Sequence, residues 1–63
     1  MQFELFEGAD NLTYFHLRAD NGEIVAASEG YHNVADALET ISLIQAEAGG
    51  AVIVEVDDSE VEF

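Results

Sequence analysis

The chain has 63 residues, enough for one domain with a marginal hydrophobic core, and no cysteine to cross-link that core. Fourteen aspartates and glutamates stand against a single arginine, for a formal net charge of -13 at pH 7. This charge excludes direct binding to nucleic acid or to an anionic membrane surface, because proteins recognise both through basic side chains.

Three strands are predicted in the first half of the chain, where apolar and polar side chains alternate. They span residues 2–7, 13–19 and 23–29. A five-residue loop from Gly8 to Leu12 connects the first two, and a two-residue type I′ turn at Asn21 and Gly22 connects the next two. The sequence therefore predicts an antiparallel meander.

The predicted pairing assigns side chains to two sheet faces, because residues opposite each other in an antiparallel pair point to the same side. The first loop places Leu5 opposite Phe15, and the turn places Ala19 opposite Ile24. We predict a core face formed by Phe15, Leu17, Ala19, Ile24, Ala26 and Ser28. The opposite face carries Tyr14, His16, Arg18, Val25, Ala27 and Glu29, with Phe6 beside Tyr14 and Glu4 beside His16.

An amphipathic helix is predicted over residues 34–48, where the apolar period lengthens to about 3.6 residues. Its apolar stripe consists of Val34, Ala37, Leu38, Ile41, Ile44 and Ala48. Asn33 is a suitable N-cap, and Gly49 and Gly50 end the helix. The following AVIVEV, residues 51–56, is apolar on both faces and predicts an interior strand. The fold class is thus α+β, in the order β-β-β-α-β, with one domain at 1–56 and an acidic tail at 57–63.

A second copy of the chain is predicted to cover the sheet face that the helix leaves free, because exposed apolar faces of this kind are normally covered. The candidate dimer or partner face consists of Phe6, Tyr14, His16, Arg18, Val25 and Ala27. Leu43 lies on the helix side opposite the apolar stripe and would also be exposed in a monomer. A homodimer would supply apolar burial that so short a chain lacks.

The hairpin and helix together resemble the YegP-like family of small domains of unknown function over about residues 2–56. The shared pattern is an aromatic-rich strand ending in Leu, an Asn-Gly turn, an Ile or Val strand, a Ser, and a Tyr before the helix. The matching residues are Phe15, Leu17, Asn21, Gly22, Ile24, Ser28 and Tyr31. The resemblance implies a β-β-β-α-β unit that occurs as tandem copies or as a dimer of single copies. It implies no catalytic residues.

Sites with a specific chemistry are weakly indicated. His16 with Glu4, and His32 beside the N-cap, match no metal-ligand spacing. The acidic stretch 20–23 lacks the length of a calcium loop, and Ser28 with His32 lacks an orienting acid and an oxyanion hole. We therefore predict no catalytic, cofactor-binding or metal-ligating residues.

The functional interpretation is a homodimeric, non-catalytic binding or structural module. Acidic side chains are spread over strands, loops and helix, which favours adaptation to a cytoplasm near molar salt and a haloarchaeal source. The start of the chain lacks a signal-peptide pattern, which also favours the cytoplasm. An acidic decoy of a basic nucleic-acid-binding protein is the alternative, and a small metal-binding or hydrolytic protein is a third.

Overall fold

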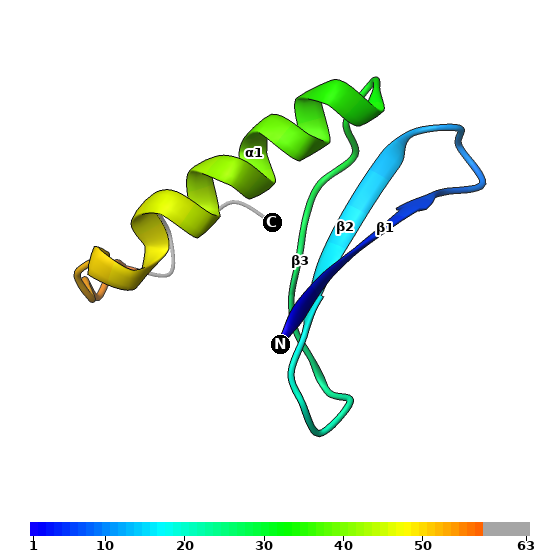
Figure 1. Cartoon of the computed structure of the whole chain (residues 1–63). Coiled ribbons are helices and arrows are strands. Elements are labelled where there is room, and N and C mark those ends of the chain that lie inside the picture. The colour runs from blue at the N-terminus through cyan, green and yellow to red at the C-terminus, as the bar shows by residue number, and fades with distance from the viewer. Residues whose placement is uncertain (58–63) are drawn as a thin grey trace.

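The computed structural model describes residues 1–57 and places one helix beside a three-stranded antiparallel sheet (Figure 1). The elements, in chain order, are β1 (Gln2–Glu7), β2 (Thr13–Arg18), β3 (Ile24–Ala27), α1 (Val34–Glu47) and a short 3-10 turn, η1 (Ala48–Gly50). The sheet order is β1-β2-β3, so β2 is central. The predicted α+β class, meander and helix are confirmed.

The first hairpin has the predicted register. Leu5 lies opposite Phe15 and Phe6 opposite Tyr14. The backbone N–H of Gly8 donates to the carbonyl of Leu12 at 2.9 Å, which closes the five-residue loop. Asn11 takes the left-handed conformation inside it, with φ of 65°. The loop length therefore sets which side chains of β1 face the helix.

The second turn differs from the predicted type I′ turn. Gly22 N–H donates to the carbonyl of Ala19 at 2.9 Å, and only Gly22, with φ of 89°, is left-handed. Asn21 lies outside the left-handed region, and its side chain accepts a hydrogen bond from the backbone N–H of Glu23 at 3.0 Å. The result is a three-residue loop in which a type I turn is followed by a left-handed glycine.

This turn shifts the register of β2 and β3. Leu17 faces Ala26 as predicted, but Arg18 rather than Ala19 faces Ile24. The step between these pairs leaves Val25 without a partner, as in a β-bulge.

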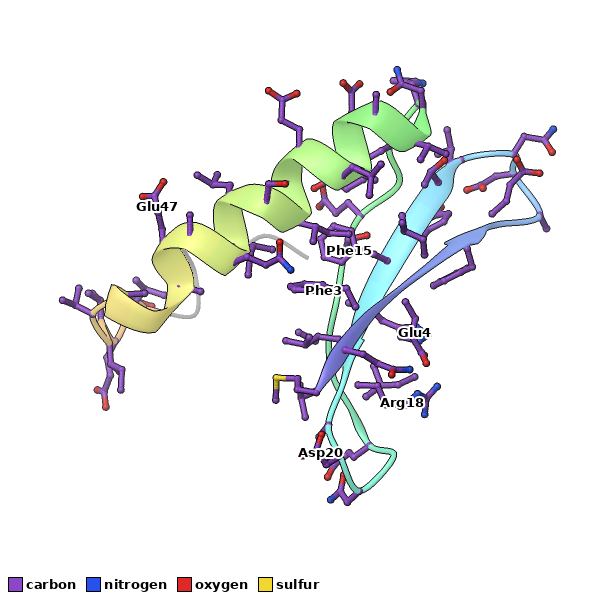
Figure 2. The ribbon with its side chains drawn as sticks, in the orientation of Figure 1. Phe3, Glu4, Phe15, Arg18, Asp20 and Glu47 are labelled. Atoms are coloured by element: carbon purple, nitrogen blue, oxygen red, sulfur yellow. The ribbon has the colours of Figure 1, made fainter. Side chains whose placement is uncertain are left out.

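The core lies between β2 and the N-terminal half of α1. Its buried hydrophobic residues are Phe15, Ala37 and Ile41, and Phe3, Tyr31 and Ile44 pack against them. Figure 2 shows Phe3 and Phe15 pointing from the sheet toward the helix, and their rings meet edge to face with centroids 5.7 Å apart. Sheet and helix therefore form two layers joined by a small apolar contact.

The helix buries less of its apolar stripe than predicted. Ala37 and Ile41 are buried, whereas Val34 and Leu38 are exposed. The C-terminal half of α1 lies away from the sheet (Figure 1), and Ile44 is the stripe residue of that half that still packs against the core. The predicted N-cap is confirmed, because Asn33 accepts a hydrogen bond from the backbone N–H of Asp36 at 2.9 Å.

The predicted strand at 51–56 is not formed within the single chain. Residues 51–57 have no strand pairing, and Val52, Ile53 and Val54 are 83%, 98% and 68% exposed. The segment starts at the end of α1 that lies away from the sheet (Figure 1), so it pairs with none of the three strands described in residues 1–57. The predicted acidic tail, Asp57 apart, lies outside the described residues.

Candidate functional site on the outer sheet face

The side of the sheet opposite α1, here called the outer face, gathers the predicted candidate residues. Tyr14, His16 and Arg18 alternate along β2, and their partners on the neighbouring strands include Phe6 and Ala27. Figure 2 shows Arg18 and Glu4 pointing away from the helix. Five of the six predicted residues thus share this face; the sixth, the half-exposed Val25, sits at the bulge.

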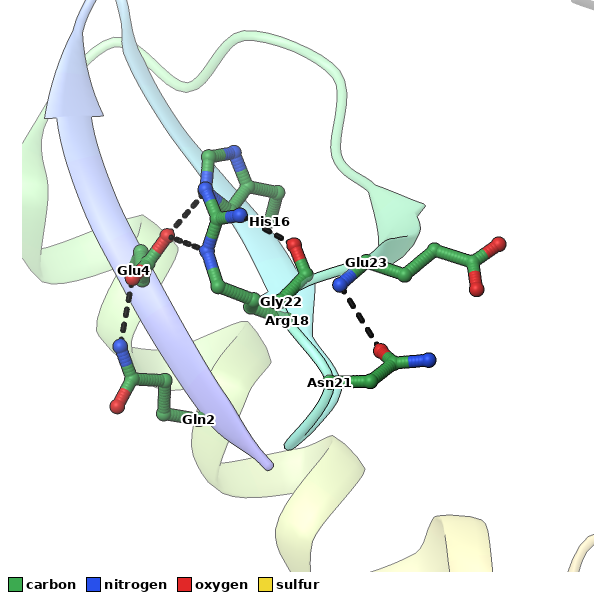
Figure 3. Close-up of polar contacts among 7 residues, drawn as sticks. All are labelled: Gln2, Glu4, His16, Arg18, Asn21, Gly22 and Glu23. Carbon is green, nitrogen blue, oxygen red and sulfur yellow. Dashed lines mark hydrogen bonds and ion pairs between the residues drawn. The ribbon is translucent and has the colours of Figure 1, made fainter.

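A polar cluster on this face is centred on Glu4 (Figure 3). Its Oε1 lies 2.5 Å from His16 Nε2 and accepts a hydrogen bond from Arg18 Nε at 2.9 Å. Its Oε2 accepts from Gln2 Nε2 at 2.6 Å. These contacts, that of His16 foremost, lower the pKa of Glu4 from its ordinary 4.5 to about 2. Glu4 is therefore a carboxylate at any physiological pH.

Arg18 connects this cluster to the turn between β2 and β3. Its Nη1 donates to the carbonyl oxygen of Gly22 at 2.5 Å, while its Nε holds Glu4 (Figure 3). The only arginine of the chain thus makes its contacts within the molecule.

Aromatic rings extend the cluster along the outer face. Phe6 stacks on Tyr14 with centroids 5.7 Å apart and leans on the His16 ring at 5.2 Å. The Tyr14 hydroxyl donates to the Asp10 carboxylate, which raises the pKa of Tyr14 and lowers that of Asp10. We call Gln2, Glu4, Phe6, Tyr14, His16 and Arg18 the outer-face cluster.

Glu4 itself is poorly suited to accept a proton near neutral pH. A carboxylate with a pKa of about 2 takes up protons too weakly to serve as a general base near neutral pH. The rings of Phe6 and Tyr14 and the guanidinium of Arg18 are held by neighbours on the same sheet.

Ser28 and Tyr31 have contacts within the fold. Ser28 Oγ accepts a hydrogen bond from the backbone N–H of Phe15 at 2.9 Å and donates to the carbonyl of Glu29 at 2.8 Å. The Tyr31 ring stacks on Phe15 with centroids 6.0 Å apart. His32 is exposed beside the N-cap. Within residues 1–57, no three histidine or acidic side chains are grouped so that they could hold a metal ion.

Gln2 is the one member of the outer-face cluster that the sequence reasoning missed. The signal was present, because Gln2, Glu4 and Phe6 alternate along β1 and must point to the same side.

A second surface is more apolar than the outer face. Leu43 on α1 and the four large apolar side chains of the segment 51–56 are exposed. Leu43 and Ala51 line one shallow depression at the C-terminal end of the helix. We call residues 51–56 the C-terminal apolar segment. None of the helices found in the described residues has the length and apolarity needed to cross a bilayer.

Comparisons with known proteins agree with this fold. Residues 9–55 match the family DUF1508, described as a domain of unknown function. A UPF0339 protein of Treponema denticola is 36% identical over 55 residues, which cover 87% of this chain and 95% of that protein. The solution NMR structure of a protein from Haloferax volcanii is similar with a TM-score of 0.79 and 32% identity, covering 87% of this chain and 93% of that one.

Proposed function

Because the chain belongs to the DUF1508 family of domains of unknown function, we propose a role from its own surfaces: a homodimeric, non-catalytic binding or structural module. Two copies associate through the C-terminal apolar segment, and the outer-face cluster is left to contact a protein partner. The relatives from Treponema denticola and Haloferax volcanii are matched over nearly their whole length. In these two relatives, one copy of the domain thus makes up nearly the whole matched chain.

Apolar exposure is the observation that carries the proposal. Among residues 1–57 only Phe15, Ala37 and Ile41 are buried hydrophobic residues, whereas Ile53 is almost fully exposed and Val52 and Val54 are largely exposed. Burial of apolar area contributes about 25 cal/mol per Å², so covering these side chains stabilises an assembly considerably. A second copy offers the C-terminal apolar segment a strand edge to pair with, since β1 and β3 are both edge strands of the sheet.

Charge sets the conditions for this association. Two copies with a formal charge of -13 each repel one another, and salt screens that repulsion. The proposal therefore includes a salt-rich cytoplasm as the working environment. An acidic decoy that occupies a basic, nucleic-acid-binding protein is the second candidate, favoured by the excess of fourteen acidic residues over one arginine, which itself pairs with Glu4.

Molar mass by light scattering in concentrated KCl tests the dimer. The unmodified chain should give the mass of two copies, and Ile53→Asp the mass of one, because a charge placed at the interface must be desolvated. Ser42→Asp adds the same charge on an exposed helix position and should stay dimeric. Far-ultraviolet circular dichroism confirms that each variant is folded.

The same measurement separates this interface from the outer face. Tyr14→Asp and Val25→Glu alter the outer face and the adjoining bulge and should leave the mass at two copies. If either gives one copy while Ile53→Asp stays dimeric, the dimer forms through the outer face instead. If the unmodified chain has the mass of one copy at every salt concentration, the homodimer is wrong.

A further inference from the structure

The Asn21-Gly22 peptide lies in an exposed turn and has a chemistry of its own. The backbone nitrogen that follows an asparagine can attack the side-chain amide carbon, and a glycine at that place offers no side chain to hinder the approach. Of the three asparagines of the chain, Asn11 precedes leucine and Asn33 precedes valine. Only Asn21 precedes glycine, and nothing lies within 4 Å of the place where a Cβ of Gly22 would be.

We propose that Asn21 is a modification site at which the chain deamidates itself when the turn opens. The Gly22 nitrogen loses its proton and bonds to Asn21 Cγ, the bond from Cγ to Nδ2 breaks, and ammonia leaves with that proton. Water then opens the resulting cyclic imide at either carbonyl. One opening gives aspartate and the other gives isoaspartate, with no oxidant or cofactor required.

The folded turn holds the reacting atoms in other bonds. Gly22 N–H donates to the Ala19 carbonyl at 2.9 Å. Figure 3 shows the second bond, in which Asn21 Oδ1 accepts from the Glu23 N–H at 3.0 Å. Arg18 holds the Gly22 carbonyl from the other side. The nucleophile is therefore engaged as a donor, so the reaction must wait until this turn opens.

Opening is local. β3 has four residues, all of them exposed, and its register is interrupted beside the turn. Segments with few buried contacts and exposed backbone hydrogen bonds open at lower free energy than the core. The rate of deamidation thus reports how often the β2-β3 turn opens, which links the modification to conditions that loosen this hairpin.

The two products affect the turn differently. Aspartate at position 21 keeps a side-chain oxygen that can accept from the Glu23 N–H, and it adds a negative charge between Asp20 and Glu23. Isoaspartate lengthens the main chain by one carbon, so the hydrogen bond from Gly22 to Ala19 cannot keep its geometry. The isoaspartyl form should therefore lose the hairpin register.

Peptide mass spectrometry after incubation at mildly alkaline pH tests the site. We expect Asn21 to convert to a mixture of aspartate and isoaspartate, while Asn11 and Asn33 in the same sample stay intact. Equal conversion of all three asparagines, or an intact Asn21 even in the denatured chain, would overturn the assignment.

The dependence on opening has a separate test. The chain should deamidate at least about tenfold faster in denaturant than when folded, because a closed turn restrains the reaction. Arg18→Gln, which removes the contact to the Gly22 carbonyl, should speed the reaction of the folded chain and leave the denatured rate unchanged. Equal rates for folded and denatured protein would show that the turn does not control the modification.

Discussion

Among the acidic residues, Glu4 joins three side chains of the outer face. Glu4 receives contacts from His16, Arg18 and Gln2, and it uses the only arginine of the chain. Without Glu4, the side chains of His16, Arg18 and Gln2 would lose the carboxylate that they share. The outer-face cluster therefore depends on Glu4 more than its partial exposure would suggest.

Replacing Glu4 by Gln should make stability less sensitive to acid. The pKa of Glu4 is about 2 in the folded chain, against 4.5 ordinarily, so its carboxylate stabilises the fold above pH 4.5. That contribution is lost as the pH falls from 4.5 to about 2. Chemical denaturation across this range should show the unmodified chain more stable than Glu4→Gln at neutral pH, with the difference shrinking in acid.

The comparison between variants removes a competing effect. Acid also neutralises the other carboxylates and relieves their repulsion in both proteins. Glu47→Gln is the matched control, because Glu47 points away from the sheet (Figure 2). A constant difference between Glu4→Gln and the unmodified chain from pH 7 to pH 2 would contradict the role given to Glu4.

Residue pairs across the first hairpin could be predicted because loop length fixes parity. Glu4 beside His16 and Phe6 beside Tyr14 follow from a five-residue loop alone. The contact from Arg18 to the Gly22 carbonyl could not be predicted, because it depends on a turn geometry that the Asn-Gly sequence leaves open.

At the scale of elements, the start of α1 depends on one side chain. Asn33 accepts a hydrogen bond from the Asp36 N–H at 2.9 Å, which satisfies one of the free donors of the first helical turn. Asn33→Ala should destabilise the protein by about 1 kcal/mol, the usual cost of losing an N-cap. For a domain of this size the melting temperature should fall by about 4–8 °C.

A variant that keeps an acceptor separates capping from other effects. Asn33→Ser should melt close to the unmodified chain, at equal protein concentration so that association does not alter the result. If Asn33→Ala melts like Asn33→Ser, the hydrogen bond to Asp36 does not support the helix.

The period of the apolar pattern was enough to predict β1, β2 and α1. It was not enough for residues 51–56, because a strand also needs a neighbouring strand to pair with. β1, β2 and α1 start and end within a residue or two of their predicted positions, because their apolar patterns have clear periods. The C-terminal apolar segment has a strand-like composition, but a strand also needs a neighbouring edge. The apolar composition of residues 51–56 indicates that their burial is favourable, but it does not identify the chain that buries them.

At the scale of the whole molecule, a small core is opposed by a large charge. Three buried hydrophobic residues in the described chain provide limited stabilisation, and a formal charge of -13 opposes both compaction and association. Salt screens the charge repulsion without changing any contact in the core. Salt should therefore control folding and assembly together.

Thermal unfolding by circular dichroism in KCl tests this balance. The screening length falls from about 10 Å at 0.1 M salt to about 3 Å at 1 M, so distant carboxylates cease to repel one another. The melting temperature should rise between about 0.1 M and about 2 M KCl, because the folded dimer holds the charges closest together. Ile53→Asp should gain less from salt, since the monomeric variant has charge repulsion within one chain but none between two chains.

Equal melting temperatures for the unmodified chain at both salt concentrations would mean that its charge is tolerated without screening. The acidic surface would then be available for recognition, and the decoy of a basic protein would become the better account of the acidity.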